Sequence, residues 1–572
     1  MKSGRWLNAL ALALTLLGLL TGQPLIVHAD PGTLYVAPDG DDSRLCNSIG
    51  SRCRTVQRAV DLAADGDTVK VAAGTYSDPD TAVLGAVVAI DKTITLSGGY
   101  DASSFADPPD PTAHVTTLDA EGQGRVITIG SDASPTIEGF IITGGDATGL
   151  GGTGGVQDAG GGIYCYEAHP TLRKNTIAGN LASSNAGVSG GGVHLERCRR
   201  SVISNNTLEG NTASSGGYGR GGGVTLVYSN EAIISGNYMV NNTASTAGTG
   251  YGGGLYVFYS AATIDGNTME RNVGSTTADG QGGGIWIQNS SVVVSKNTVK
   301  GNAAGAPNLG TGGGVLAVYC EAITLDSNLI LDNTAQSGNG VAISQGSTFT
   351  LTNNIIAGNH SGCAPWQECG GALWLSARSE YPTNGTLVHN TIADNAGDEE
   401  STGQGLYVRN YVTVDLINNI IAGHTVGISN TDPASAVVTA DHTLFNGNDT
   451  NYGSGVTSIN DLAGDPAFVN PTLGDYHLLA RSAAIDQGVA AGVAEDIDGD
   501  HRPLSAGYDI GADEWDPSKP PPTSTPTATA SPTPTRMPTA SATATPTATP
   551  TRTPTAVQWQ LYLPLLLRRI SA

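Results

Sequence analysis

Residues 190–211 read GGGVHLERCRRSVISNNTLEGN, and residues 221–242 read GGGVTLVYSNEAIISGNYMVNN, with residue types in nearly the same order. Each stretch has three glycines, an alternation of apolar and polar residues, a bend, a second alternation and two asparagines five residues apart. Alternation with a period of two predicts short β-strands, and Val, Ile, Thr, Asn and Gly all disfavour helix. The two stretches therefore indicate an internal repeat built from strands.

The repeat continues along the chain in three series that stay in phase. The last small residue before each apolar strand recurs at Gly162, Gly192, Gly223, Gly254, Gly284, Gly314, Gly340, Ala372 and Gly405. The two asparagine series are Asn175, Asn206, Asn237, Asn267, Asn297, Asn328, Asn354, Asn390 and Asn419, and Asn180, Asn211, Asn242, Asn272, Asn302, Asn333, Asn359 and Asn395. His424 breaks the second series. Regular spacing of this kind predicts a solenoid.

Each repeat fits one coil of a parallel β-helix, in which every strand pairs with its equivalent about 4.8 Å away in the next coil. Asparagine tolerates left-handed turns and can bond to its neighbour in the next coil, so both series are expected to stack. The residues one and three places after each reference position are expected to fill the interior: Ile163, Val193, Val224, Leu255, Ile285, Val315, Val341, Leu373 and Leu406, then Cys165, Leu195, Leu226, Val257, Ile287, Ala317, Ile343, Leu375 and Val408.

Seven cysteines leave at least one unpaired. Cys46 with Cys53, and Cys363 with Cys369, are close enough in sequence to close small disulfide loops. We interpret the other three as buried apolar fillers: Cys165, Cys198 and Cys320.

The N-terminus resembles a secretory signal, with Lys2 and Arg5 before an apolar run that Gln23-Pro24 cuts below membrane-spanning length. Residues 517–556 are almost entirely Pro, Thr, Ser and Ala and are typical of an extended spacer. The predicted organisation is a signal peptide (1–29), an N-terminal cap with the first coils (30–100), the repeats (101–430), C-terminal coils with a closing module (431–515), a Pro/Thr-rich linker (516–556) and a short apolar and basic tail (557–572). The tail resembles a bacterial surface-sorting signal; a sticky unstructured end is the alternative.

The formal charge of −24 argues against nucleic acid and anionic membranes as partners. We expect no membrane span in the mature protein and a monomer located outside the cytoplasm. Acidic polysaccharides stay possible as partners wherever a local basic patch exists.

Both ends of the repeat array carry a family resemblance. LYVAPDGDDSRLCNSIGSRCRTVQRAVDLAADGDTVKVAAGTY (34–76) and DYHLLARSAAIDQGVAAGVAEDIDGDHRPLSAGYDIGADEW (475–515) resemble the opening segment and the closing module of bacterial secreted right-handed β-helix proteins of the pectate-lyase-like superfamily. The resemblance implies an all-β, right-handed parallel β-helix, and residues 54–64 are expected to form a short helix that plugs its first coil. It does not decide activity, because this superfamily contains lyases, hydrolases, epimerases and non-enzymatic surface proteins.

Residues two and four places after each reference position should point outward. The first row is Tyr164, His194, Thr225, Tyr256, Trp286, Leu316, Ala342, Trp374 and Tyr407; the second row is Tyr166, Glu196, Val227, Phe258, Gln288, Val318, Ser344, Ser376 and Arg409. Flat rings on an open face could stack on sugars, and the expected substrate-binding residues are Tyr164, Tyr166, Tyr256, Trp286, Trp374 and Tyr407. The alternative is that the long loops between coils fold over this face and bury the rings.

The densest chemical cluster on this face is HLERCRR (194–200). A lyase needs a base near C5 of a uronate and a cation for its carboxylate, so the candidate catalytic residues are His194, Glu196 and Arg197. A solvated, salt-bridged edge is the alternative reading, and it is favoured.

One metal candidate stands in the closing module. Asp496, Asp498 and Asp500 have the spacing used in calcium loops, although Gly507 stands where an EF-hand needs a glutamate. A turn whose aspartates cap backbone amides is the alternative.

Two functions remain open on the sequence alone. The first is a non-enzymatic β-helix, secreted or displayed on the surface, that binds polysaccharide or an envelope component. The second is a polysaccharide lyase or glycoside hydrolase acting on uronate-type glycans. The near-uniform repeats and the absence of the best-marked catalytic motifs slightly favour the first.

Overall fold

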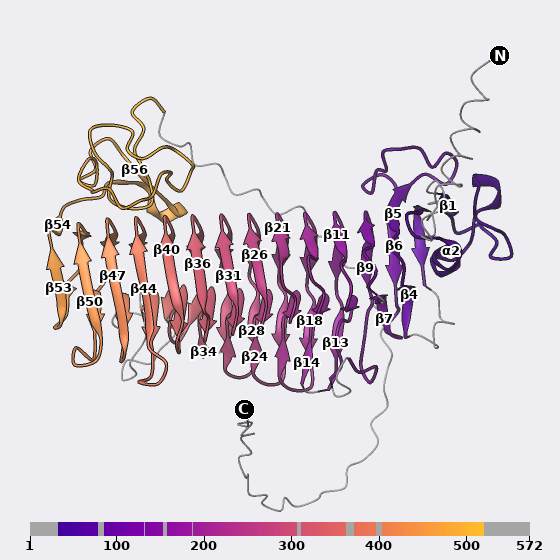
Figure 1. Ribbon diagram of the computed structural model, residues 1–572, viewed down its shortest axis with the longest axis horizontal. Coiled ribbons are helices and arrows are strands. Elements are labelled where there is room, and N and C mark those ends of the chain that lie inside the picture. Colours follow the sequence, from indigo (N-terminus) through magenta and orange to yellow (C-terminus); the bar gives the residue numbers. More distant parts are fainter. Residues whose placement is uncertain are drawn as a thin grey trace, which may run out of the picture. The chain divides into compact units, whose positions relative to one another are not determined.

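The structure is a computed structural model and describes residues 32–77, 85–130, 132–152, 157–185, 187–305, 310–361, 371–395 and 403–519. Within these ranges the chain forms three long sheets of 15, 13 and 14 parallel strands and two shorter sheets of seven and five strands (Figure 1). Consecutive coils supply neighbouring strands, so the predicted parallel β-helix is confirmed. The predicted signal peptide, the Cys363–Cys369 pair and residues from 520 onward lie outside the described residues.

One coil shows how the repeat is used. It consists of β15 (Val193–Glu196), β16 (Val202–Ser204), β17 (Thr207–Glu209), β18 (Thr212–Ser214) and the two-residue strand β19 (Gly219–Arg220). The first three strands belong to the three long sheets, and β18 and β19 belong to the shorter sheets.

We call the 13-stranded sheet the site sheet, because its strands contain the outward rows described in the sequence analysis. Its strands are, in order, β4 (Ala86–Ile90), β7 (Arg125–Ile129), β10 (Ile163–Tyr166), β15, β20 (Val224–Val227), β25 (Leu255–Phe258), β30 (Ile285–Gln288), β35 (Val315–Val318), β39 (Val341–Ser344), β43 (Leu373–Ser376), β46 (Gln404–Val408), β49 (Val426–Asn430) and β52 (Thr450–Tyr452). Val193 pairs with Val224, and that residue pairs with Leu255, as the alignment predicts. Both interior rows are fully buried.

The asparagines form two continuous ladders through the core. Asn242 is fully buried, and its Oδ1 accepts hydrogen bonds from both the backbone N–H (3.1 Å) and Nδ2 (2.9 Å) of Asn211. Its own Nδ2 donates to the carbonyl of Leu208 (2.9 Å) and to Oδ1 of Asn272 (2.9 Å). Each asparagine side chain thus forms hydrogen bonds with backbone groups of the preceding coil and with the side-chain amide of the next coil. A buried polar group without a hydrogen-bond partner would lower the stability of the fold.

His424 lies within the second ladder, where the sequence indicated a break. Nδ2 of Asn395 contacts Nε2 of His424 at 3.2 Å, and the backbone N–H of His424 donates to Oδ1 of Asn448 at 3.0 Å. An imidazole nitrogen takes the place of the amide oxygen, so the ladder extends by one more coil.

The glycine triplets are required by close backbone packing as well as by turns. In the triplet 252–254, Gly252 has φ +66°, a conformation that favours glycine. A Cβ on Gly253 would lie 2.5 Å from the carbonyl oxygen of Gly283 in the next coil, and a Cβ on Gly254 would lie 2.8 Å from that of Gly284. The triplet therefore marks the place where neighbouring backbones come closest.

Two of the cysteine predictions hold and one is wrong. Cys46 and Cys53 form a disulfide, and Cys320 is free and buried. Cys165 and Cys198 are bonded to each other, with a Cα–Cα distance of 6.6 Å, and are therefore not separate fillers. One coil step followed by the bend after β15 brings Cys198 onto Cys165.

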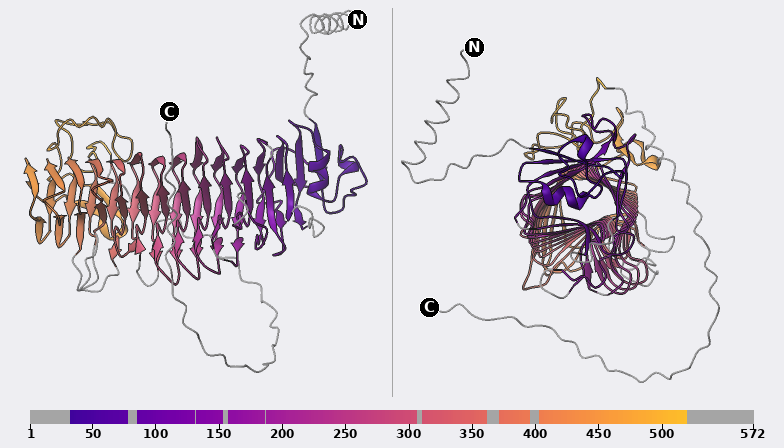
Figure 2. Two further views of the ribbon diagram at one scale, coloured as in Figure 1. Left: turned by 60° about the horizontal axis from the view of Figure 1, so that its bottom comes forward. Right: turned by 90° about the vertical axis from the view of Figure 1, so that its right-hand side faces the viewer.

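The N-terminal end is closed by α2 (Val56–Leu62), a shorter helix than the predicted span of 54–64. Oγ1 of Thr55 caps the helix by accepting from the N–H of Arg58, and Val56, Ala59 and Val60 are buried. Figure 2 shows α2 across the opening of the first coils. The chain enters this end through β1 (Thr33–Val36), which pairs with β2 (Thr68–Ala72).

The closing module lies along the side of the last coils and not over their end (Figure 1). The coils continue to β53 (Val456–Ile459) and β54 (Leu462–Ala463), and β55 (Phe468–Asn470) and β56 (Asp475–Leu478) then form an antiparallel pair. Tyr476, Leu478 and Ile510 of the module pack on outward apolar residues of the 14-stranded sheet, such as Ile420 and Leu444.

Candidate functional site

The first outward row of the sequence analysis is confirmed in register on the outer face of the site sheet. Tyr164 pairs with His194, Tyr256 pairs with Trp286, and Trp374 pairs with Tyr407. The row is nevertheless not the open platform that the ring-binding prediction requires. Tyr256, Trp286 and Tyr407 are at most 5% exposed, whereas Tyr164 and Trp374 are half-buried.

Two features bury the rings. The rings stack on one another from coil to coil, with centroids 4.6 Å apart for Tyr256 and Trp286. The glycine turn before each strand also lies against the row, and a Cβ on Gly282 would come 2.8 Å from Cβ of Trp286. Most rings of the first outward row are therefore buried, as in the alternative to the ring-binding prediction. A sugar cannot reach the faces of Tyr256 and Trp286.

A cavity of about 600 Å³ crosses the second outward row beside the buried rings. One wall is formed by the site sheet, with Glu196, Phe258 and Gln288. The other wall is formed by four strands of the five-stranded sheet, which are β14 (Val188–Ser189), β19, β24 (Gly250–Tyr251) and β29 (Gly280–Gln281); the fifth strand of this sheet is β34 (Gly310–Thr311). We call this cavity the ridge groove.

Polar groups of the five-stranded sheet face the ridge groove. Nη1 of Arg220 donates to Oε1 of Gln157 (3.1 Å), and Nε2 of Gln157 donates to the hydroxyl of Tyr218 (3.1 Å). The Arg220 guanidinium also lies 6.0 Å from the ring centroid of Tyr256, within the range of a cation–π contact. Arg220 lines the groove, and no ion pair with a carboxylate is recorded for it in the described part of the chain.

His194 and Glu196 lie together at the N-terminal part of the ridge groove. Nε2 of His194 is 3.7 Å from Oε2 of Glu196, and Nδ1 is buried without a hydrogen bond to any described residue. Burial is the main cause that lowers the pKa of His194, against the opposing effect of Glu196, so the ring is neutral near pH 7. The ring stacks on Tyr164, with centroids 5.7 Å apart, and the Arg125 guanidinium lies 4.6 Å from the centroid of Tyr164.

Arg197, the third candidate catalytic residue, points away from His194. Its Nη1 donates to Glu167 (3.0 Å) and to the hydroxyl of Tyr166 (3.1 Å), both on the preceding coil. These residues line a second cavity of about 1180 Å³ over β4, β7 and β10, which we call the arginine cavity. Arg200 pairs with Glu231 at its rim. The structure thus brings two of the three candidates together and places Arg197 in an exposed ion pair.

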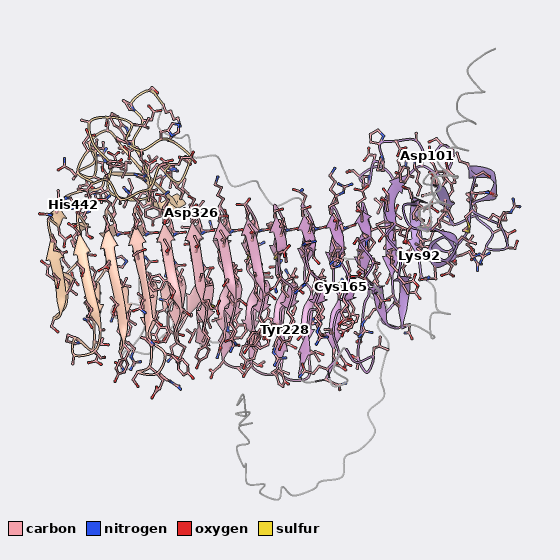
Figure 3. All side chains as sticks on the ribbon, in the orientation of Figure 1. Lys92, Asp101, Cys165, Tyr228, Asp326 and His442 are labelled. Atoms are coloured by element: carbon pink, nitrogen blue, oxygen red, sulfur yellow. A yellow bond between two sulfur atoms is a disulfide. The ribbon has the colours of Figure 1, made fainter. Side chains whose placement is uncertain are left out.

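Exposed tyrosines that were not predicted as site residues stand five places after two of the reference positions. Tyr228 and Tyr259 are 47% and 48% exposed, and their rings stack with centroids 5.5 Å apart. Both have positive φ (51° and 45°), which is rare for bulky residues. Figure 3 labels Tyr228 on the coils; it directly follows the last residue of β20. The signal was present in the alignment, but the outward rows were followed only to the fourth place.

The three aspartates of the predicted calcium loop have separate partners. Asp496 is buried, and its carboxylate accepts from the backbone N–H groups of Asp498, Asp500 and Glu514. Asp498 pairs with His477 (3.0 Å), and Asp500 pairs with Lys519. Asp496 therefore acts as the backbone cap that was the alternative interpretation. A calcium ion held by all three stays a prediction.

With the coils and the two cavities described, the class of protein follows. A family model described as a right-handed β-helix region matches residues 114–379, which confirms the handedness and the fold-level resemblance of the sequence analysis. In the described residues no helix is long and apolar enough to cross a membrane.

Solved structures with a similar arrangement include carbohydrate-active proteins. The pectate lyase Pel9A is 13% identical, with 86% of this chain and 98% of that chain covered and a TM-score of 0.33. The A-module of the mannuronan C-5 epimerase AlgE6 of Azotobacter vinelandii is 16% identical, with 72% and 94% covered and a TM-score of 0.37. A tailspike protein of E. coli bacteriophage HK620, solved with a hexasaccharide, is 11% identical, with 76% and 75% covered and a TM-score of 0.25. No curated protein matches the sequence.

Proposed function

We propose that the protein is a secreted or surface-displayed bacterial β-helix protein that binds a polysaccharide along the ridge groove. The predicted signal peptide at residues 1–29 supports export, and the acidic charge argues against nucleic acid as the ligand. The monomeric chain supplies both walls of the groove. The observation that carries the proposal is a groove that crosses successive coils beside half-exposed tyrosines.

The dimensions of the ridge groove suit an extended chain. Its lining residues come from six successive strands of the site sheet or the loops before them, from Gly152 before β10 to Val318 of β35. Five steps of about 4.8 Å give a length of roughly 24 Å. The arginine cavity continues over the preceding strands of the same sheet. A linear glycan can therefore follow the solenoid axis and contact one coil after another.

The chemistry of the groove suits hydroxyl-rich ligands. Gln281 and Gln288 offer amide donors and acceptors, and Arg220 offers a cation without a carboxylate partner among the described residues. Tyr228 and Tyr259, which directly follow β20 and β25, offer apolar rings that are about half exposed. Polar groups that fix orientation next to exposed rings are what sugar recognition requires, because sugars present both hydroxyl edges and apolar faces.

Binding can be tested by affinity electrophoresis or calorimetry against neutral and uronate polysaccharides. The informative variant is Tyr228→Asn with Tyr259→Asn, because asparagine occupies the equivalent position in the next coil (Asn289, φ 49°) and accepts the same backbone conformation. We expect this variant to bind at least about ten-fold more weakly, which corresponds to about 1.4 kcal/mol. Tyr411→Asn is the matched control, because Tyr411 is 42% exposed with φ 55° on a distant coil.

The outcomes separate cleanly. Loss of binding in the double tyrosine variant, with normal binding in the Tyr411→Asn control, supports the groove. Equal binding by both variants, or no binding to any polysaccharide by the unaltered chain, overturns the proposal.

A second candidate function, cleavage of uronate glycans, is favoured by one observation. His194 is neutral, and its buried Nδ1 has no hydrogen bond to a described residue. In a β-elimination, His194 would take the C5 proton, the electron pair would form the C4–C5 double bond, and the C4–O bond would break as its oxygen gains a proton from Glu196 or water. Arg197 would have to leave Glu167 to neutralise the uronate carboxylate.

This second function is tested by incubating the protein with uronate polymers, with and without calcium, and measuring the ultraviolet absorbance of unsaturated ends. Product that disappears in His194→Ala and in Arg197→Ala would establish a lyase. Binding without product would support the non-enzymatic function and contradict the lyase.

A further inference from the structure

The closing module contains a compact cluster of one histidine and two aspartates. The ring of His477, on β56, and the carboxylates of Asp498 and Asp513 each offer one ligand atom, and these atoms lie within 4.8 Å of one another. They line a cavity of about 490 Å³ with Trp515 and Lys519. The cluster lies apart from both cavities of the site sheet.

His477 is oriented by a carboxylate on its far side. Nδ1 lies 2.7 Å from Asp475, and Nε2 lies 3.0 Å from Asp498. Both ring nitrogens must therefore carry protons in this state. Carboxylate oxygens thus contact both nitrogens of the ring. A histidine whose Nδ1 is held by a carboxylate while Nε2 faces two others is also how proteins orient a histidine toward a metal ion.

Asp513 supplies a second and independent indication. Its side chain is 7% exposed, and Oδ2 accepts from the backbone N–H of Leu478 (2.7 Å). For the other oxygen, Oδ1, no hydrogen bond to a described residue is recorded. A buried carboxylate with an unused oxygen on the wall of a cavity is poised to accept a cation.

We propose that His477, Asp498 and Asp513 bind a divalent transition-metal ion of the Zn²⁺ type, which takes the place of the proton on Nε2 of His477. One imidazole nitrogen and two carboxylate oxygens suit zinc, with water from the cavity as a further ligand. Calcium takes oxygen ligands, so the histidine disfavours it. The site differs from the predicted calcium loop, because Asp496 is used by backbone amides and Asp500 pairs with Lys519.

The test is isothermal titration of the full chain, free of histidine tags, with Zn²⁺, and separately with Ca²⁺, at several pH values. We expect one Zn²⁺ per chain, release of the Nε2 proton of His477, and affinity that increases with pH because the proton and the metal compete. Asp513→Asn is expected to weaken Zn²⁺ binding at least about 100-fold, and Asp475→Asn about 10- to 100-fold. Asp516→Asn, on the same cavity, is the matched control and should bind normally.

A thermal melt with and without Zn²⁺ gives a second readout, in which only chains with the intact site should be stabilised by the metal. His477→Gln provides a second variant if Asp513→Asn folds poorly. Equal Zn²⁺ affinity in the unaltered chain, Asp513→Asn and His477→Gln would overturn the proposal. So would a lack of Zn²⁺ binding, or binding of Ca²⁺ in preference to Zn²⁺.

Discussion

Replacing His424 with asparagine should remove a defined part of the acid sensitivity of the last coils. Nδ2 of Asn395 also donates to the carbonyls of Ile356 and Ala393, both at 2.9 Å, which fixes the amide nitrogen toward Nε2 of His424. Nε2 must therefore accept, and the ring proton must lie on Nδ1, which faces Oδ1 of Asn448 at 3.3 Å. If Nε2 of His424 were also protonated, its N–H would face the N–H of the Asn395 amide, and neither donor would have an acceptor there.

The magnitude follows from the pKa. Burial is the main cause that lowers the pKa of His424 from 6.5 to about 4, with a smaller opposing effect of Asn448. As the pH falls below 6.5, the unfolded chain takes up a proton that the folded chain refuses until about pH 4, so stability is lost over this window. The difference between the pKa of His424 in the unfolded chain and in the folded chain corresponds to about 3 kcal/mol.

The assay is urea denaturation between pH 7.5 and pH 4, combined with hydrogen exchange of the coils around residues 385–448. Relative to His424→Asn, the unaltered protein should lose about 3 kcal/mol of unfolding free energy across this range. His360→Asn is the control, because His360 is exposed. Its pH profile should follow that of the unaltered protein. If the unaltered protein and His424→Asn have parallel profiles, the ladder does not hold His424 neutral and the reasoning is refuted.

Three further predictions concern the coils. Asn242→Ala removes four buried hydrogen bonds and should lower the unfolding free energy by about 4 kcal/mol in urea denaturation; a loss within error would contradict a structural role for the ladder. Reduction of the Cys165–Cys198 disulfide, which spans 33 residues, should cost about 3 to 4 kcal/mol, and identical urea midpoints before and after reduction would refute this. Gly253→Ala should destabilise more than Gly266→Ala in thermal melts, because a Cβ on Gly253 meets backbone atoms at 2.5 Å whereas a Cβ on Gly266 meets nothing within 4 Å.

Much of the fold could be predicted because the repeat reports on backbone geometry. The rows through Val193 and Leu195 had to face inward once the alternation was aligned, and the structure confirms both. The asparagine positions were predictable for the same reason. The stacking of the asparagine side chains could also be predicted in part, since it requires only that equivalent positions of neighbouring coils lie one above the other.

The candidate site was less predictable, because it depends on segments that do not follow the alternation. Whether Trp286 is open depends on how closely the glycine turn approaches it, and the sequence offers no distance. Arg220 lies in β19, outside both outward rows of the alignment, although it lines the ridge groove. The Cys165–Cys198 bond was missed because it joins neighbouring coils through the bend after the strand. Non-periodic contacts of this kind need coordinates.

The stacking of equivalent residues has a consequence for how such a chain can change in evolution. Within the asparagine ladders each coil forms its hydrogen bonds with the coil before it and the coil after it, so one whole unit of about 30 residues in the middle of the array can be duplicated or lost while the ladders stay continuous. The unit that begins at Gly314 is already four residues shorter than its predecessor, yet its asparagines still meet their partners. Genetic gain or loss of a unit would thus lengthen or shorten the ridge groove by one rung, and under the proposed function this would change the length of ligand that the groove can hold.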